Sequence, residues 1–250
     1  MAVIWQKTQQ GKQYEVRAAG QTRRLYTDGV FHSQYNPNRQ LTGNVWDLLS
    51  LPSFFLEPNR VRRVLVLGVG GGAVIRQLLS WYPDAEIVGV ELDNTHISIS
   101  KRFFGLKHKR VTLIEANAIT WLKSYRGLAF DIVIEDLFGD VNGEPESVIE
   151  ASAHWVKQLS KNLSAYGLLV MNFTESKDFR SNAIFHDKPL QKKFKMVYKF
   201  TTPLYENNIA VLLQTPCKTN QWRKRILSTP ELVNEYQLSQ DKVKIRKMMG

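Results

Sequence analysis

Residues 64–73, Val64-Leu65-Val66-Leu67-Gly68-Val69-Gly70-Gly71-Gly72-Ala73, decide the fold of this chain. The four apolar residues predict a buried strand, and residues 73–81, with apolar side chains at positions 74, 75, 78 and 79, predict a helix. The glycines between them tolerate positive φ angles and let a ligand approach the backbone closely. Their spacing also matches the dinucleotide-binding pattern G-x-G-x-x-G/A, in the strand-turn-helix context that the pattern requires. We therefore expect Gly68, Gly70, Gly71 and Gly72 to bind a nucleotide-type cofactor.

Strands and helices alternate along the chain beyond this turn. Further apolar strands are predicted at residues 87–90, 111–114, 132–134 and 167–171, with helices at 94–104, 118–125 and 148–163. This alternation predicts an α/β doubly wound fold with a mostly parallel sheet. The last two strands, 195–200 and 209–213, are joined by a loop rather than a helix. The pattern predicts a seven-stranded sheet with an antiparallel terminal hairpin, which favours a methyltransferase-type Rossmann-like fold over a dehydrogenase.

The chain divides into three predicted regions. Residues 1–60 form a small β-rich region, with short strands, an Asp28-Gly29 turn and a helix from Asn44 to Phe55. Residues 61–215 form the nucleotide-binding domain. Residues 216–250 are polar and basic, and we expect a partly helical, partly frayed tail.

The charge balance indicates the class of partner. The 250 residues include 34 Lys and Arg against 23 Asp and Glu, a formal net charge of +11. A positive field of this kind favours anionic partners. In the basic tail, Trp222-Arg223-Lys224-Arg225 combines an aromatic ring with cations, a combination that can bind nucleic acid. The alternative is a solvated tail or a contact with another partner.

Polar residues follow the predicted strands where parallel strands form a ligand crevice. Glu91 closes the second strand and can accept hydrogen bonds from both ribose hydroxyls. Asn117 can accept from an adenine amino group or cap the following helix, and the backbone at Ala118 can contact the ring. Asp136 follows the fourth strand and is the candidate catalytic residue, either as general base or as an anchor for positive charge. A loop of solvated acids is the alternative for Asp136.

An acidic group is predicted around Asp136. Asp140 follows it closely and Tyr205 lies on the loop of the terminal hairpin, so both are candidate substrate-binding residues. The neighbouring acids are Glu135, Glu144, Glu146 and Glu206. An acidic mouth in a basic protein suits a small cationic or amine acceptor. Solvation of an ordinary loop is the alternative reading.

Several classes of protein are disfavoured by what the sequence lacks. Its single cysteine, Cys217, has no partner for a disulfide, which favours a cytoplasmic location. The five histidines show no metal-ligand spacing, so we expect no metal. No apolar run reaches the length of a membrane-spanning helix, so we expect no membrane partner.

The glycine turn, Glu91 with Asp93, Asn117 and Asp136, in this order, resemble the spermidine synthase (polyamine aminopropyltransferase) family, within the class I S-adenosylmethionine-dependent methyltransferase fold. Residues 25–30 and 45–52 resemble the family's first strand-turn and the helix before its nucleotide domain. The resemblance implies S-adenosylmethionine or its decarboxylated form as cofactor, with methylthioadenosine or S-adenosylhomocysteine as product. It also implies that Asp136 deprotonates an attacking amine, and that the protein forms a homodimer.

The chain departs from the family's pattern at the acceptor side. The glycine turn lacks the family's aspartate, Tyr-His-Glu becomes Val45-Trp46-Asp47, and a glutamine becomes His32. Asn117 replaces an aspartate, and Asp-Ser-Ser-Asp-Pro becomes residues 136–140, Asp-Leu-Phe-Gly-Asp. Three hypotheses follow: a transferase that moves an aminopropyl or methyl group to an amine, a dehydrogenase that binds NAD, and a catalytically inactive nucleotide-binding or interaction protein.

Overall fold

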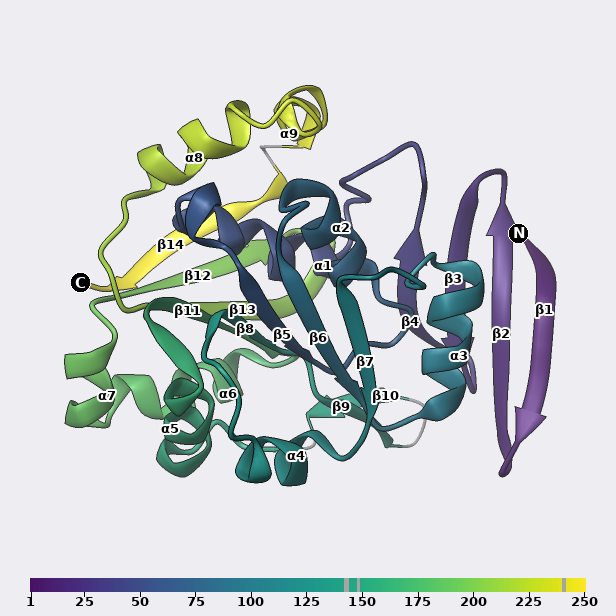
Figure 1. Ribbon diagram of the computed structural model, residues 1–250, viewed down its shortest axis with the longest axis horizontal. Helices are drawn as coiled ribbons and strands as arrows, with labels where there is room; N and C mark the ends of the chain where they lie inside the picture. The colour runs from purple at the N-terminus through teal and green to yellow at the C-terminus, as the bar shows by residue number, and fades with distance from the viewer. Residues whose placement is uncertain (142–143, 148, 240–241) are drawn as a thin grey trace.

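The computed structural model describes residues 1–141, 144–147, 149–239 and 242–250. Its centre is an eight-stranded sheet in the order β14-β12-β13-β11-β8-β5-β6-β7 (Figure 1). The strands are β5 (Arg63–Leu67), β6 (Glu86–Glu91), β7 (Val111–Glu115), β8 (Phe130–Glu135), β11 (Leu163–Phe173), β12 (Met196–Thr202), β13 (Tyr205–Leu213) and β14 (Lys244–Met249). Strands β5 to β8 and β11 run parallel, whereas β13 pairs antiparallel with β11 and β12. The predicted parallel sheet and terminal hairpin are therefore confirmed, and β14 joins the predicted seven strands as an eighth.

Helices cover both faces of this sheet (Figure 1). One face carries α1 (Val45–Ser50), η1 (Leu51–Phe55), η2 (Pro58–Arg60), α2 (Ala73–Trp81), α8 (Thr219–Leu227) and α9 (Val233–Ser239). The other carries α4 (Ala118–Ser124), α5 (Ala153–Lys161), α6 (Ser176–Ser181), η3 (Ala183–Phe185) and α7 (Lys188–Lys193). Strands buried on both sides explain the continuous apolar runs in the sequence.

One observed helix is shorter than the helix that the apolar pattern predicts. The predicted helix at 148–163 is wrong at both ends, because α5 begins at Ala153 and ends at Lys161. The Ser152 side chain accepts a hydrogen bond from the backbone N–H of Trp155 at 3.3 Å and so caps the helix start. Val148, where the prediction began the helix, lies outside the described residues.

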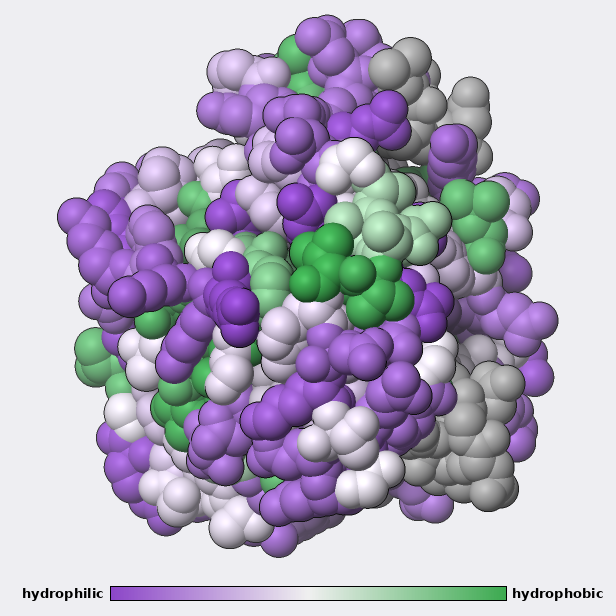
Figure 2. Space-filling model, turned by 90° about the vertical axis from the view of Figure 1, so that its right-hand side faces the viewer, coloured by the Kyte–Doolittle hydropathy of each residue, from purple (hydrophilic) through white to green (hydrophobic). Residues whose placement is uncertain are grey.

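The N-terminal region forms a separate antiparallel sheet of β1 (Ala2–Gln9), β2 (Lys12–Ala19), β3 (Thr22–Thr27) and β4 (Val30–Tyr35). Tyr14, Val16 and Leu25 bury one face of it against α3 (Asn94–Phe103) and Phe104. Edge strand β1 was not predicted, since nearly all its side chains are exposed and it lacks a buried face. The molecular surface on this side is mostly hydrophilic, with an apolar patch near its centre and smaller apolar areas elsewhere (Figure 2).

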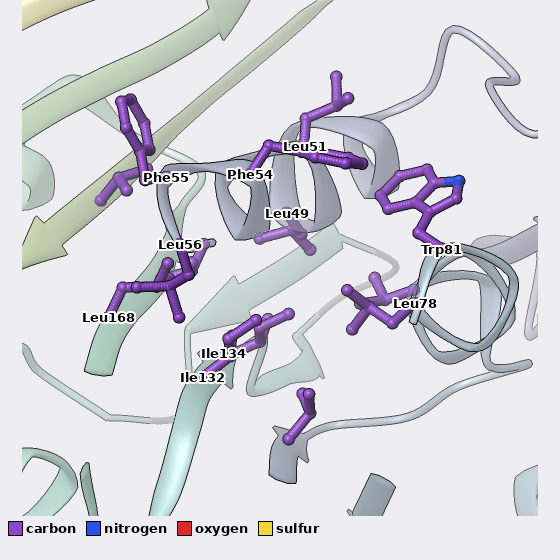
Figure 3. Packing of buried hydrophobic residues seen from close by; sticks show 14 of the residues in the cluster. Leu49, Leu51, Phe54, Phe55, Leu56, Leu78, Trp81, Ile132, Ile134 and Leu168 are labelled. Atoms are coloured by element: carbon purple, nitrogen blue, oxygen red, sulfur yellow. The ribbon is translucent and has the colours of Figure 1, made fainter. Parts of the chain in front are cut away.

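The helix that precedes the nucleotide domain packs directly on the central strands. Leu49 of α1 points toward Ile132 and Ile134 of the sheet, and Leu56, which follows η1, lies beside Leu168 (Figure 3). Phe54 of η1 packs against Trp81 of α2, with ring centroids 5.2 Å apart. This contact fixes the start of α1, which borders the cavity described below.

The C-terminal segment is folded onto this same face, not frayed. Trp222 of α8 has no exposed surface and its Nε1 donates a hydrogen bond to the Leu51 carbonyl at 2.8 Å. Its ring packs against Phe55, Phe200 and Tyr236. The expected tail was misjudged because a stripe of apolar residues is embedded among many charges: Trp222, Ile226, Leu232 and Tyr236. With its ring buried, Trp222 is unavailable for stacking on a nucleic acid base.

The buried Trp222 predicts a structural role for the basic segment. We expect Trp222→Ala to lower the free energy of unfolding by about 3–5 kcal/mol, because it removes a large core side chain. Urea unfolding followed by circular dichroism measures this. The matched control is Arg223→Ala, an exposed neighbour on the same helix, which should change stability by no more than about 0.5 kcal/mol. Equal effects of the two substitutions would contradict the packing.

Candidate active site

A cavity of about 540 Å³ opens at the carboxyl ends of the parallel strands. Its walls come from the ends of β5, β6 and β8, the start of α4, the β3–β4 turn, the start of α1 and the start of β13. This volume is in the range of small-molecule sites. The crevice is the one that doubly wound folds use for ligands, so the sheet itself places the candidate site.

The glycine turn after β5 lines the cavity with Gly68 and Gly70. Both have positive φ angles, +84° and +52°. A Cβ on Gly68 would lie 2.1 Å from the backbone oxygen of Asp136, and one on Gly70 would lie 2.9 Å from the backbone oxygen of His32. Glycine is required here because two other backbone segments approach the turn, and also because the φ angles are positive.

Gly71 and Gly72 pack against other segments of the protein. A Cβ on Gly71 would lie 2.6 Å from Cβ of Ser33, and one on Gly72 would lie 2.1 Å from Cδ1 of Leu106. Neither glycine is among the described residues that line the cavity. These two positions make room for the N-terminal sheet and for the loop after α3, and their predicted contact with a cofactor stays a prediction.

Glu91 ends β6 and is buried at the cavity wall. Its Oε2 accepts the backbone N–H groups of Val69 and Gly70 at 2.9 and 2.8 Å, and its Oε1 accepts that of Asp93 at 3.0 Å. The carboxylate therefore ties the glycine turn to the end of the neighbouring strand. Its predicted contact with a ribose stays a prediction.

Asn117 and Ala118 lie at the cavity wall where α4 begins. The Asn117 side-chain oxygen accepts the backbone N–H groups of Ile119 and Thr120 at 3.0 and 3.1 Å. Of the two roles considered for Asn117, the structure contains the helix cap. The predicted contacts of the Asn117 side-chain oxygen with an adenine amino group, and of the Ala118 backbone with the ring, stay predictions.

Asp136 follows β8 and faces the cavity. Asn172 of β11 donates a hydrogen bond to its Oδ1 at 2.7 Å, and Asn207 of β13 donates to the Asn172 side-chain oxygen at 3.0 Å. Burial raises the pKa of Asp136 to about 6. A carboxyl group with that pKa is ionised at neutral pH and can still take up a proton, which suits a general base.

The predicted acidic mouth is only partly present among the described residues. Glu135 is 3% exposed and does not line the cavity, and burial raises its pKa to about 8. Glu206 is exposed and also does not line the cavity. Asp140 is in β9 (Phe138–Val141), opposite Pro145 of β10 (Glu144–Ser147), and the side chains of this hairpin from residue 139 onward lie outside the described residues. Asp136 is the member of the predicted group whose carboxylate the structure brings to the cavity.

Tyr205 lines the cavity, as its candidate role requires. Its hydroxyl donates a hydrogen bond to the side-chain oxygen of Asn44, the residue before α1. Tyr205 therefore joins the start of β13 to the start of α1, and any contact with a substrate stays a prediction.

Several site residues were missed by the sequence reasoning. Asn172 and Asn207 hold Asp136, and His96 lies against Thr27, with 2.8 Å between Nε2 and the hydroxyl oxygen. Asn172 carries a signal that could have been used, because it stands near the carboxyl end of a predicted strand, like Asp136. His96 and Asn207 carry none, since a helix position and an antiparallel strand face the site only after the sheet has formed.

Metal sites and membrane-spanning helices are the other features considered among the described residues. Within the part of the chain that the structure describes, no group of three or more His, Cys, Asp and Glu side chains is arranged to hold a metal ion. Across the same described residues, no helix is both long and apolar enough to cross a membrane. Cys217 is buried, with Arg225 donating to its sulfur at 3.3 Å.

The fold defines an α/β protein of the methyltransferase-like fold class, with a cavity at the carboxyl ends of its parallel strands. Residues 47–223 match the family model of the spermine/spermidine synthase domain. Because this match covers more than half of the chain, the protein belongs to the spermine/spermidine synthase family, whose curated relatives are transferases.

Curated relatives agree with this membership. The chain is 32% identical over 105 residues to a polyamine aminopropyltransferase 2 of Caldanaerobacter subterraneus subsp. tengcongensis, covering 41% of this chain and 35% of that protein. It is 26% identical to a polyamine aminopropyltransferase of Vibrio vulnificus, covering 69% and 56%. The matches thus span about half or less of the length of these curated relatives.

Solved structures show the same fold at low identity. A probable spermidine synthase from Corynebacterium glutamicum superposes with a TM-score of 0.75 at 16% identity, covering 99% of this chain and 91% of that one. Human methyltransferase-like protein 13, in complex with S-adenosylhomocysteine (SAH), gives 0.64 at 15% identity, covering 76% and 92%. These likenesses establish the fold.

The close approach of Gly68 to Asp136 predicts that replacing Gly68 by alanine strongly destabilises the fold. Gly68→Ala should lower the free energy of unfolding by more than about 4 kcal/mol, because its Cβ would overlap the Asp136 carbonyl. Gly29→Ala is the matched control, since Gly29 has the same φ of +85° with nothing within 4 Å. It should cost about 1–2 kcal/mol of backbone strain alone. Urea unfolding distinguishes the two, and similar losses would refute the close approach.

Proposed function

We propose that this protein transfers an aminopropyl group from decarboxylated S-adenosylmethionine to a small amine. The observation that carries the proposal is the Asp136 carboxylate, which Asn172 holds at the wall of the cavity that the glycine turn and Glu91 also line. Membership of the spermine/spermidine synthase family supports this reading over a dehydrogenase or an inactive protein. The activity remains a proposal because the curated relatives are matched over only part of their length.

The residues at one end of the cavity fit the nucleoside part of such a cofactor. Gly68 and Gly70 leave space for close approach, Glu91 offers a buried carboxylate beside the turn, and Asn117 and Ala118 border the start of α4. A carboxylate in this place suits the two ribose hydroxyls. The bound cofactor supplies a carbon attached to a sulfonium sulfur, which is displaced by a nucleophile.

Asp136 supplies the proton acceptor in this proposal. The amine nitrogen forms a bond to the propyl carbon, the carbon–sulfur bond breaks with its electron pair left on sulfur, and the nitrogen loses a proton. Oδ1 of Asp136 is held by Asn172, so the carboxylate keeps its orientation while Oδ2 takes this proton. Alignment of the nitrogen with the carbon is the second contribution of the site.

Methyl transfer from S-adenosylmethionine is the second candidate. The observation that favours it is the absence of an acid in the glycine turn, where the described cavity wall has Gly68, Val69 and Gly70. Without a carboxylate there, a cofactor that retains its own carboxylate meets less repulsion.

Calorimetry tests the proposal directly. Purified protein is titrated with decarboxylated S-adenosylmethionine, S-adenosylmethionine, methylthioadenosine and NAD. We expect the decarboxylated cofactor and methylthioadenosine to bind more tightly than NAD. Tighter binding of S-adenosylmethionine than of its decarboxylated form would favour methyl transfer instead. Binding of none of the four would refute both transferase proposals.

The raised pKa of Asp136 predicts the pH dependence of the activity. A general base must be ionised, so kcat/KM should fall about tenfold per pH unit as the pH drops below about 6. Asp136→Asn should lower kcat by about 10²–10⁴-fold, because the amide cannot accept the proton. Release of methylthioadenosine from the decarboxylated cofactor measures both. Full activity of Asp136→Asn, with unchanged folding by circular dichroism, would exclude the catalytic role.

A further inference from the structure

We call the part of the cavity around Asp136 its acceptor end. A chain of two hydrogen bonds and one separate hydrogen bond connect the segments that form it. Asn207 donates to Asn172, which donates to Asp136, so the ends of β8 and β11 and the start of β13 meet at the carboxylate. Tyr205, on the same strand as Asn207, donates to Asn44 at the start of α1. The first residues of α1 therefore border the same end of the cavity as Asp136.

The wall that α1 contributes is apolar and aromatic. Val45 and Trp46 line the cavity together with Phe31 of β4. The Phe31 and Trp46 rings pack edge to face, with centroids 5.0 Å apart and planes at 90°. Leu137 and Phe138 continue the apolar lining after β8. A ligand that reaches from Asp136 to this wall meets rings and aliphatic groups.

The acid next to Trp46 is turned away from the cavity. Asp47 is 4% exposed, and its Oδ2 accepts the backbone N–H groups of Thr42 and Gly43 at 3.0 and 2.7 Å. Its Oδ1 accepts the Gln77 side-chain amide at 2.6 Å. Both oxygens are used within the protein, so Asp47 is not available to a substrate ammonium group.

The other carboxylates at the described cavity wall are also engaged within the protein. Glu91 holds the glycine turn, Asp93 accepts the Tyr14 hydroxyl at 2.6 Å and caps α3, and Asp28 accepts the Gln13 backbone N–H at 2.7 Å. Among the described residues that line the cavity, Asp136 is the carboxylate at the ends of β8 and β11, whereas Glu91 and Asp93 lie after β6 and Asp28 lies in the β3–β4 turn.

These contacts bear on the acceptor of the proposed reaction, and the inference rests on that proposed function. We propose that the acceptor is a monoamine with an apolar or aromatic body, whose single nitrogen meets Asp136 while its body lies against Trp46 and Phe31. A second ammonium group on that wall would be desolvated without a carboxylate partner among the described residues, which is costly. Aromatic rings attract a cation far more weakly than a carboxylate does. The net charge of +11 acts in the same direction, because it repels a dication more than a monocation.

A pair of acceptors with the same carbon chain tests this inference. 1-Aminopentane and 1,5-diaminopentane are compared with decarboxylated S-adenosylmethionine by release of methylthioadenosine, and 2-phenylethylamine tests the aromatic body. We expect kcat/KM for the monoamine to exceed that for the diamine by about tenfold or more. Binding of both amines to the protein saturated with methylthioadenosine is measured by calorimetry as an independent readout, with the same preference expected.

The two readouts separate the two proposals. Equal or tighter binding of the diamine, with equal or faster turnover, overturns the monoamine acceptor and leaves aminopropyl transfer standing. Preferential binding of the monoamine without release from any amine supports the acceptor site and overturns aminopropyl transfer.

Substitution of Trp46 tests whether the apolar wall at this residue sets the preference for a monoamine over a diamine. Trp46→Glu places a carboxylate on the wall, and Trp46→Gln is the matched control that loses the same ring without adding charge. We expect Trp46→Glu to raise the ratio of diamine to monoamine kcat/KM about tenfold relative to Trp46→Gln. Equal ratios in the two variants would overturn the role of this wall. Circular dichroism checks that both variants fold, and the comparison of acceptors on the unaltered protein stands independently of it.

Discussion

The close approach of the glycine turn to the end of β8 is the constraint on which the site depends. Gly68 lies so near the Asp136 carbonyl that no side chain fits between them. Glu91 fixes the other side of the turn through the backbone N–H groups of Val69 and Gly70. The ends of β5, β6 and β8 are thereby fixed relative to one another. The cavity beside them is therefore preorganised before any ligand enters.

Segments outside the central sheet complete this cavity. The N-terminal sheet contributes His32 and Phe31, and it is joined to the start of α3 by the hydrogen bond from Tyr14 to Asp93. Helix α8 packs against η1 through Trp222, whose Nε1 donates to the Leu51 carbonyl and whose ring packs on Phe55. Since η1 continues from α1, this packing also sets the position of Trp46. Regions outside the central sheet thus shape the part of the cavity wall that includes Phe31 and Trp46.

The fold was largely predictable because its signals are local. The strands β5, β6, β7 and β8 are short apolar runs, and α2 was predicted from Ala73 to Trp81 with its observed bounds. Predictions failed where the local signal was masked or absent. The apolar stripe of α8 and α9 is hidden among lysines and arginines, and β1 has almost no buried face. Burial of such segments depends on the surface they meet.

By itself, the sequence determined the parallel sheet, its closing hairpin and the position of Gly68, Gly70, Glu91 and Asp136 around one crevice, since apolar period and strand-end position suffice for these. Only the tertiary structure decided which polar groups remain available there. The Asp47 carboxylate accepts hydrogen bonds from Thr42, Gly43 and Gln77, and Glu135 is buried away from the cavity. A carboxylate in the sequence does not show which backbone donors will compete for it, because those donors come together only when distant segments pack.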